Sequence, residues 1–188
     1  MKKVYIVHRW DSSPESDWYP WLKKELIKRK FEADILRMPD PGFPKIDVWV
    51  NYLNENVKNI DKDTILIGHS VGCQTILRFM EKLPFDVKVG KVVLVAPWLE
   101  LRGIEEEGPE VVKIAKPWLK KKINWNKINE HCEKFVCIFS TNDPYVPLSN
   151  VEKLYNKLGN KTIILKNKGH FTKEEGVKEL PEILEWIG

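Results

Sequence analysis

Short runs of apolar residues recur along the chain, separated by longer segments in which polar residues are frequent. The runs are rich in Val and Ile and are almost continuously apolar, which is typical of strands covered on both faces, as in a parallel sheet. The pattern therefore predicts six strands, at residues 3–8, 32–37, 64–68, 91–96, 135–140 and 161–166.

Apolar residues recur at helical spacing in the segments between these runs. They predict helices within residues 17–30, 43–57, 70–83, 149–158 and 178–187. Proline is tolerated in the first turn of a helix, so Pro20 and Pro181 indicate that the first and last helices begin inside these limits. The alternation predicts an α/β fold with a mostly parallel, doubly wound sheet of about six strands and helices on both faces.

One segment, residues 97–133, interrupts the alternation. It has no strand pattern, and three tryptophans lie there among charged residues, glycines and prolines. So long an interruption in a small domain is more often a lid or a binding loop than a linker. We expect a single domain over residues 1–188, with 97–133 as a small cap or lid-like insertion.

Composition narrows the classes of function. The 31 basic residues are spread among 27 acidic ones, for a net charge of +4, so no basic surface for nucleic acid is predicted. The three cysteines form neither a CxxC pair nor a zinc-ligand spacing, which is typical of a reducing compartment. Apolar stretches are too short for a signal peptide or a membrane helix. We expect a cytoplasmic protein without a membrane partner, and its oligomeric state is left open.

The stretch TILIGHSVGCQTILRF, residues 64–79, carries the first chemical signal. Its Gly-x-Ser-x-Gly places Ser70 between a predicted strand and a predicted helix, as in the nucleophile elbow of α/β-hydrolases. With 10 glycines in 188 residues, the motif is expected by chance only about 0.02 times. An ordinary glycine-rich turn is the alternative, and the rest of the chain has to decide.

A serine becomes a nucleophile when a histidine removes its proton and a carboxylate orients that histidine. In this fold the order along the chain is Ser, Asp or Glu, then His, each following a strand. Asp143 follows the fifth predicted strand and His170 follows the sixth. His8 ends the first strand, and His69 lies inside the elbow. Local hydrogen bonding is the expected role of both.

Several motifs together make the chain resemble the small α/β-hydrolases of the retinoblastoma-binding protein 9 / YdeN-like serine hydrolase family. These are "SDWYPWLKKEL", "MPDP", "TILIGHSVG", "KVVLVAP", "INWNKINEHC", "STNDPYVP" and "GHF", in the expected order nearly from end to end. The resemblance implies an α/β-hydrolase sheet with a reduced cap, a triad of Ser70, Asp143 and His170, and neither a metal nor an organic cofactor.

The resemblance also implies an oxyanion hole made of backbone N–H groups. Val71, after the nucleophile, supplies one, and the loop after the first strand supplies the other through Trp10 or, alternatively, Arg9. Members of the family often carry glycine after the first-strand histidine, whereas this chain has Arg9. A Leu-x-Cys-x-Glu stretch for binding pocket proteins is absent, so the family's name does not indicate this chain's partner.

These observations predict a serine hydrolase acting on a small acyl compound, with a carboxylic ester favoured over an amide. The alternatives are an amidase or peptidase that uses the same triad, and a non-catalytic protein-binding member of the family. Arg9, Trp118 and Trp125 are candidate substrate contacts. The guanidinium of Arg9 could pair with a substrate carboxylate, with phosphate, or with an acid of the protein itself.

Overall fold

Six parallel strands form one sheet at the centre of the computed structural model, which describes residues 2–188. The spatial order of the strands is β2-β1-β3-β4-β5-β6, and every neighbouring pair is parallel. All six predicted strands are confirmed to within one residue at each end. Their bounds are β1 Lys3–Val7, β2 Glu32–Leu36, β3 Thr64–His69, β4 Lys91–Val95, β5 Phe135–Ser140 and β6 Lys161–Leu165.

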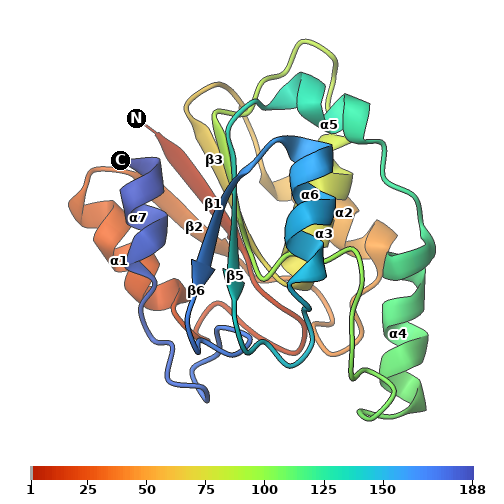
Figure 1. The fold of residues 1–188 in the computed structure, drawn as a ribbon. Helices are drawn as coiled ribbons and strands as arrows, with labels where there is room; N and C mark the ends of the chain where they lie inside the picture. Colours follow the sequence, from red (N-terminus) through yellow and green to blue (C-terminus); the bar gives the residue numbers. More distant parts are fainter. Residues whose placement is uncertain (1) are drawn as a thin grey trace.

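Helices cover both faces of the sheet, as predicted. Figure 1 shows α1 and α7 on one face and α2, α3 and α6 on the other. The prolines act as expected, because Pro20 lies in the first turn of α1 and Pro181 is the first residue of α7. These helices are α1 Tyr19–Lys28, α2 Ile46–Asn56, α3 Val71–Met80, α6 Ser149–Leu158 and α7 Pro181–Ile187.

The segment 97–133 contains two helices that the sequence pattern did not predict. They are α4 Pro109–Lys120 and α5 Trp125–His131. The pattern is weak because Pro117 lies inside α4, where it removes one backbone hydrogen bond, and because α5 has only seven residues. In Figure 1, α4 stands at the side of the molecule, beyond the helices that cover the sheet.

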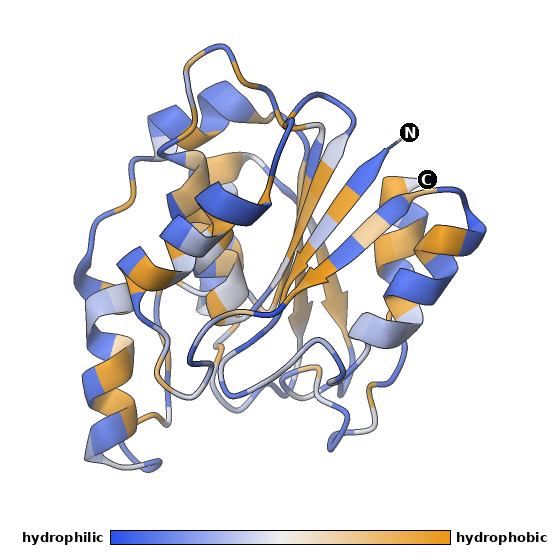
Figure 2. Ribbon diagram, turned by 180° about the vertical axis from the view of Figure 1, so that it is seen from behind, coloured by the Kyte–Doolittle hydropathy of each residue, from blue (hydrophilic) through white to orange (hydrophobic). Residues whose placement is uncertain are grey.

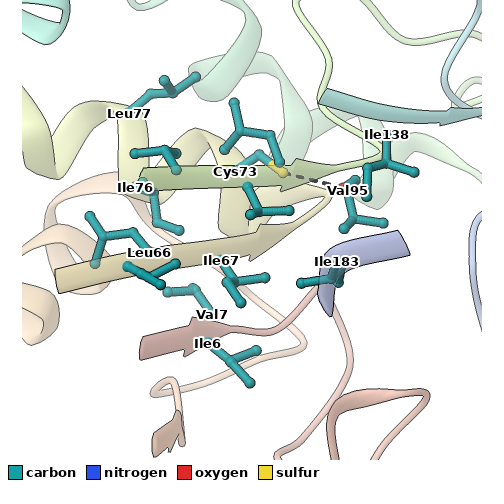
Figure 3. Close-up of a cluster of buried hydrophobic side chains, with 14 of the residues drawn as sticks. Ile6, Val7, Leu66, Ile67, Cys73, Ile76, Leu77, Val95, Ile138 and Ile183 are labelled. Atoms are coloured by element: carbon teal, nitrogen blue, oxygen red, sulfur yellow. Dashed lines mark hydrogen bonds between the residues drawn. The ribbon is translucent and has the colours of Figure 1, made fainter. Parts of the chain in front are cut away.

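The core lies between the sheet and its two helical layers. Figure 2 shows hydrophobic colour over much of the sheet, with hydrophilic colour on parts of some strands, and a mixture of the two on the helices. All six residues of β3 are buried, which explains why its sequence shows no polar alternation. Figure 3 shows side chains of β1, β3, β4, β5, α3 and α7 gathered there, among them Ile6, Leu66, Ile76, Val95, Ile138 and Ile183.

The strand order places a crevice next to β1 and β3. The chain runs from β1 outward to β2 and then returns to β3 on the other side of β1. In an open parallel sheet, ligands bind at such a reversal, outside the carboxyl ends of the strands. The loop that begins at His8 and the turn at Ser70 both leave the sheet at this point.

Within residues 2–188, none of the helices has the length and apolar character needed to cross a bilayer. The cytoplasmic location stays a prediction.

Two isoleucines offer a matched test of the core. Ile67 in β3 is fully buried, whereas Ile164 in β6 is 49% exposed. We expect Ile67→Ala to lower the free energy of unfolding by about 2–5 kcal/mol, because it removes buried methyl groups and leaves a cavity. Ile164→Ala should cost about 1 kcal/mol or less. Urea unfolding of both variants checks this, and equal losses would contradict the assignment of β3 to the core.

Candidate active site

Ser70 occupies a strained turn between β3 and α3. Its φ of 53° and ψ of −116° lie outside the regions favoured by residues with side chains. The turn is held because the N–H of Ser70 donates to the carbonyl of Val95 at 2.9 Å. The side chain of Ser70 does not cap α3. Strain of this kind persists where the surrounding structure enforces it, and it occurs most often at functional sites.

The two glycines of the motif are needed for close packing around Ser70. A Cβ atom added to Gly72 would lie 2.3 Å from the carbonyl oxygen of Val7, the last residue of β1. A Cβ atom added to Gly68 would lie 2.7 Å from the backbone nitrogen of Cys73. The start of α3 therefore packs directly against β1, and the turn at Ser70 has no room for larger residues at these two positions.

Asp143 and His170 meet at the carboxyl ends of β5 and β6. The Nδ1–H of His170 donates to Oδ2 of Asp143 at 2.8 Å, and both side chains are buried. Oδ1 of Asp143 accepts the backbone N–H groups of Tyr145 and Val146, each at 2.9 Å. The carboxylate is thus held by three donors, and in the neutral imidazole the Nε2 atom is left as the proton acceptor.

Residues that the sequence analysis missed hold the loop of His170. Oε2 of Glu175 accepts the backbone N–H of His170 at 2.6 Å and that of Thr172 at 3.2 Å. The ring of Tyr145 meets the imidazole edge to face, with ring centres 5.3 Å apart. The Thr-x-x-Glu spacing from Thr172 to Glu175 is the pattern of a capping box and could have revealed this contact.

The backbone N–H groups of the loop after β1 differ in whether they are hydrogen-bonded. The N–H of Arg9 donates to the hydroxyl of Tyr19 at 3.1 Å, and the carbonyl of Arg9 accepts the Nδ1–H of His8 at 2.8 Å. Carbonyl and N–H point in opposite directions across a trans peptide, so the N–H of Trp10 points away from His8. Among the described residues, none accepts the N–H of Trp10 or of Val71.

The side chain of Arg9 is bound by the protein itself. Its Nε donates to Oδ2 of Asp17 at 2.8 Å, and its Nη1 donates to the carbonyl of Trp10 at 3.1 Å. Burial opposes the charge of Arg9, but the hydrogen bonds and charge of Asp17 outweigh burial and raise the pKa of the guanidinium. The sequence left three possible partners for the guanidinium of Arg9. The structure shows that its partner is an acid of the protein itself, Asp17.

A cavity of about 530 Å³ joins these groups. Ser70, Val71 and His170 line it together with Arg9 and Trp10. The segment 97–133 supplies much of the remaining wall, through Trp98, Leu101, Ile104, Glu107, Glu110, Val111 and Ile114.

Two of the predicted substrate contacts lie elsewhere. Trp118 is buried, and its Nε1–H donates to the carbonyl of Pro44 at 3.0 Å. Trp125 is half-buried at the start of α5 and lines a separate surface hollow. Neither residue lines the cavity of Ser70. The last turn of α4 packs against α2 and α3, and α5 packs against α3.

Comparison with known proteins shows the family to which this chain belongs. The model of a family described as serine hydrolase matches residues 4–188. The chain belongs to the serine hydrolase family. It is 32% identical to YdeN of Bacillus subtilis over 180 residues, covering 96% of this chain and 91% of YdeN. It is 28% identical to the serine hydrolase RBBP9 of Rattus norvegicus, covering 84% of this chain and 80% of that protein.

Solved structures agree with the sequence comparisons. The crystal structure of YdeN superimposes with a TM-score of 0.88 at 30% identity and covers 98% of this chain and 96% of that one. The resemblance to the YdeN-like hydrolases is confirmed, and so is the α/β-hydrolase fold.

One substitution tests the close approach of Gly72 to Val7. We expect Gly72→Ala to destabilise the protein by about 1–3 kcal/mol, because the new methyl group would meet the Val7 carbonyl. Gly42→Ala is the control, since its Cβ would lie no nearer than 3.8 Å to another residue, at Asp11. Thermal unfolding of both variants checks this, and an unchanged melting temperature for Gly72→Ala would contradict the close packing.

His69 predicts a dependence of stability on pH. Its pKa is held well below the usual range, first by burial and then by His170 and Arg9. Below pH about 6.5 the unfolded chain binds a proton at this residue while the folded chain does not. The free energy of unfolding therefore decreases as the pH is lowered. For one such group the loss approaches about 1.4 kcal/mol per pH unit.

Urea unfolding between pH 7 and about 5 measures this slope. His69→Gln should show a shallower dependence than the natural chain, because its amide does not titrate. Equal slopes for the two proteins would mean that His69 takes up a proton in the folded state.

Proposed function

We propose that this member of the serine hydrolase family cleaves a small acyl substrate, a carboxylic ester, through an acyl-enzyme formed on Ser70. One observation carries the proposal: a single cavity is lined by Ser70 on its strained turn and by His170, whose Nδ1–H is bound by Asp143. The order and spacing of these residues along the chain give independent support.

In the proposed mechanism the hydroxyl of Ser70 attacks the ester carbonyl, and Nε2 of His170 accepts its proton. Asp143 holds the Nδ1–H of the imidazole and stabilises the imidazolium that forms. His170 then gives the proton to the departing alcohol, which leaves Ser70 acylated. Water, activated by the same histidine, attacks the acyl-enzyme and releases the acid.

The developing oxyanion would be bound by the N–H groups of Val71 and Trp10. Val71 and Trp10 both line the cavity, and their N–H groups lack an acceptor among the described residues, whereas the N–H of Arg9 is engaged by Tyr19. The loss of one such donor typically raises the barrier by about 2.7–4 kcal/mol. Trp10 is therefore the proposed donor, and the alternative at Arg9 is dropped.

The cavity wall supports an uncharged, apolar acyl group. The segment 97–133 would act as the cap, with Leu101, Ile104 and Ile114 facing the substrate. Arg9 is neutralised by Asp17, so it is not free to bind a substrate carboxylate. An ester is proposed before an amide because an alcohol leaves more readily than an amine and needs less help from His170.

Labelling by a fluorophosphonate tests whether Ser70 is an activated nucleophile. The natural protein should be labelled and should turn over chromogenic esters. Ser70→Ala should abolish both, with unfolding unchanged within about 1 kcal/mol, because the backbone contacts and not the hydroxyl hold the turn. The matched control is Ser149→Ala in α6, whose hydroxyl bonds only to Glu100 at the surface.

Asp143→Asn should lower kcat by about three to four orders of magnitude, because an amide does not select the reactive tautomer of His170. Combined with Ser70→Ala, it should cost little more, since the residues act as a unit. Labelling that persists in Ser70→Ala would place the nucleophile elsewhere. Faster turnover of matched amides than of esters would contradict the choice of ester.

A further inference from the structure

Two buried side chains outside the proposed triad connect its parts. Tyr19, in the first turn of α1, and His69, the last residue of β3, are both fully buried. The hydroxyl of Tyr19 lies 2.7 Å from Nδ1 of His69, and the Nε2 of His69 lies 2.8 Å from the carbonyl oxygen of His170. The hydroxyl of Tyr19 also accepts a hydrogen bond from the backbone N–H of Arg9.

The chemistry of these groups fixes the direction of each hydrogen bond. A backbone carbonyl only accepts, so Nε2 of His69 carries the proton and donates to His170. The pKa of His69 is lowered well below its usual range by burial, so the ring is neutral and its Nδ1 is an acceptor. The hydroxyl of Tyr19 therefore donates to His69 and accepts from Arg9, which uses one hydrogen and one lone pair of the phenol.

The result is a continuous chain of hydrogen bonds from the N–H of Arg9 to the carbonyl of His170. One end lies one peptide before Trp10, the proposed oxyanion donor. The other end is the backbone of the proposed general base. These loops follow β1 and β6, which are not neighbours in the sheet, so strand pairing alone does not set the distance between them.

A second connection runs beside the first. Oδ2 of Asp17 accepts from Nε of Arg9 at 2.8 Å, while Oδ1 accepts the backbone N–H of Lys173 at 2.9 Å. Asp17 has a φ of 50° and a side chain only 1% exposed, so this carboxylate is held in a strained and buried position. Both connections join the loop of residues 8–11 to the loop of residues 170–173.

We propose that Tyr19 and His69 are positioning residues that hold the oxyanion loop and the base loop at the spacing the transition state requires. Neither residue lines the cavity itself, and each acts through a residue that does: Tyr19 binds the backbone of Arg9, and His69 binds the backbone of His170. The inference rests on the proposed function, because it assigns these residues a part in that same reaction. A misplacement of about 1 Å in such a site can cost about 10²-fold in rate.

Tyr19→Phe is the principal test, because it removes only the hydroxyl. We expect kcat on the preferred ester to fall about 10- to 100-fold with KM unchanged within about twofold, since the oxyanion forms only in the transition state. A trifluoromethyl ketone, which forms an oxyanion on the enzyme, should bind more weakly by the same factor, while inhibition by the carboxylic acid product stays constant. A purely structural role would not separate the two inhibitors.

Matched variants complete the experiment. Tyr5→Phe is the control, because its hydroxyl bonds only to the Lys58 carbonyl at 3.5 Å and lies outside the site. His69→Gln retains one donor and one acceptor and should keep kcat within about fivefold, whereas His69→Leu has neither and should lose at least as much as Tyr19→Phe.

The outcomes separate this inference from the proposed function. If the natural enzyme is labelled at Ser70 while folded Tyr19→Phe keeps its kcat and its affinity for the ketone, the positioning role is wrong and the function stands. Equal losses in His69→Gln and His69→Leu would also overturn the role. A natural protein that resists the probe and hydrolyses no ester overturns both.

Discussion

The contact between Gly72 and the carbonyl of Val7 is the constraint on which the rest of the site depends. It brings the start of α3 against the end of β1, at the point where the strand order reverses. Ser70, two residues before Gly72, has a positive φ of 53°, and Val71 lines the same cavity as the loop that follows β1. A methyl group at position 72 would push α3 away from β1 and so move Ser70 relative to the loop that follows β1.

The surroundings of Ser70 are positioned both by the sheet and by hydrogen bonds within the loops. The sheet supplies rigid carboxyl ends at β1, β3, β5 and β6, and buried hydrogen bonds then orient the loops that leave them. The carboxylates of Asp17, Asp143 and Glu175 all accept backbone N–H groups of such loops. Asp17 and Asp143 are buried, so water competes less for their hydrogen bonds than it does for a salt bridge at the surface.

Arg9 illustrates how the surroundings decide the role of a residue. A guanidinium beside a cavity suggests recognition of an anion, and the sequence offered no means of choosing among its partners. In the structure Asp17 neutralises Arg9, and the guanidinium binds the carbonyl of Trp10. The positions of Trp118 and Trp125 depended in the same way on the path of α4, whose pattern Pro117 weakens, and of α5, which has only seven residues.

The sequence alone determined the six strands, five of the helices, the elbow, and the order of Ser70, Asp143 and His170. These features are local: apolar runs follow the period of the element that buries them, and the expected catalytic residues directly follow strands. Only the tertiary structure decided what Tyr19, His69 and Asp17 contact, and which tryptophans reach the cavity. Hydrogen bonds such as that between Tyr19 and His69 join residues about fifty positions apart. No periodicity records such pairs, because they form only when the helices and loops pack around the sheet.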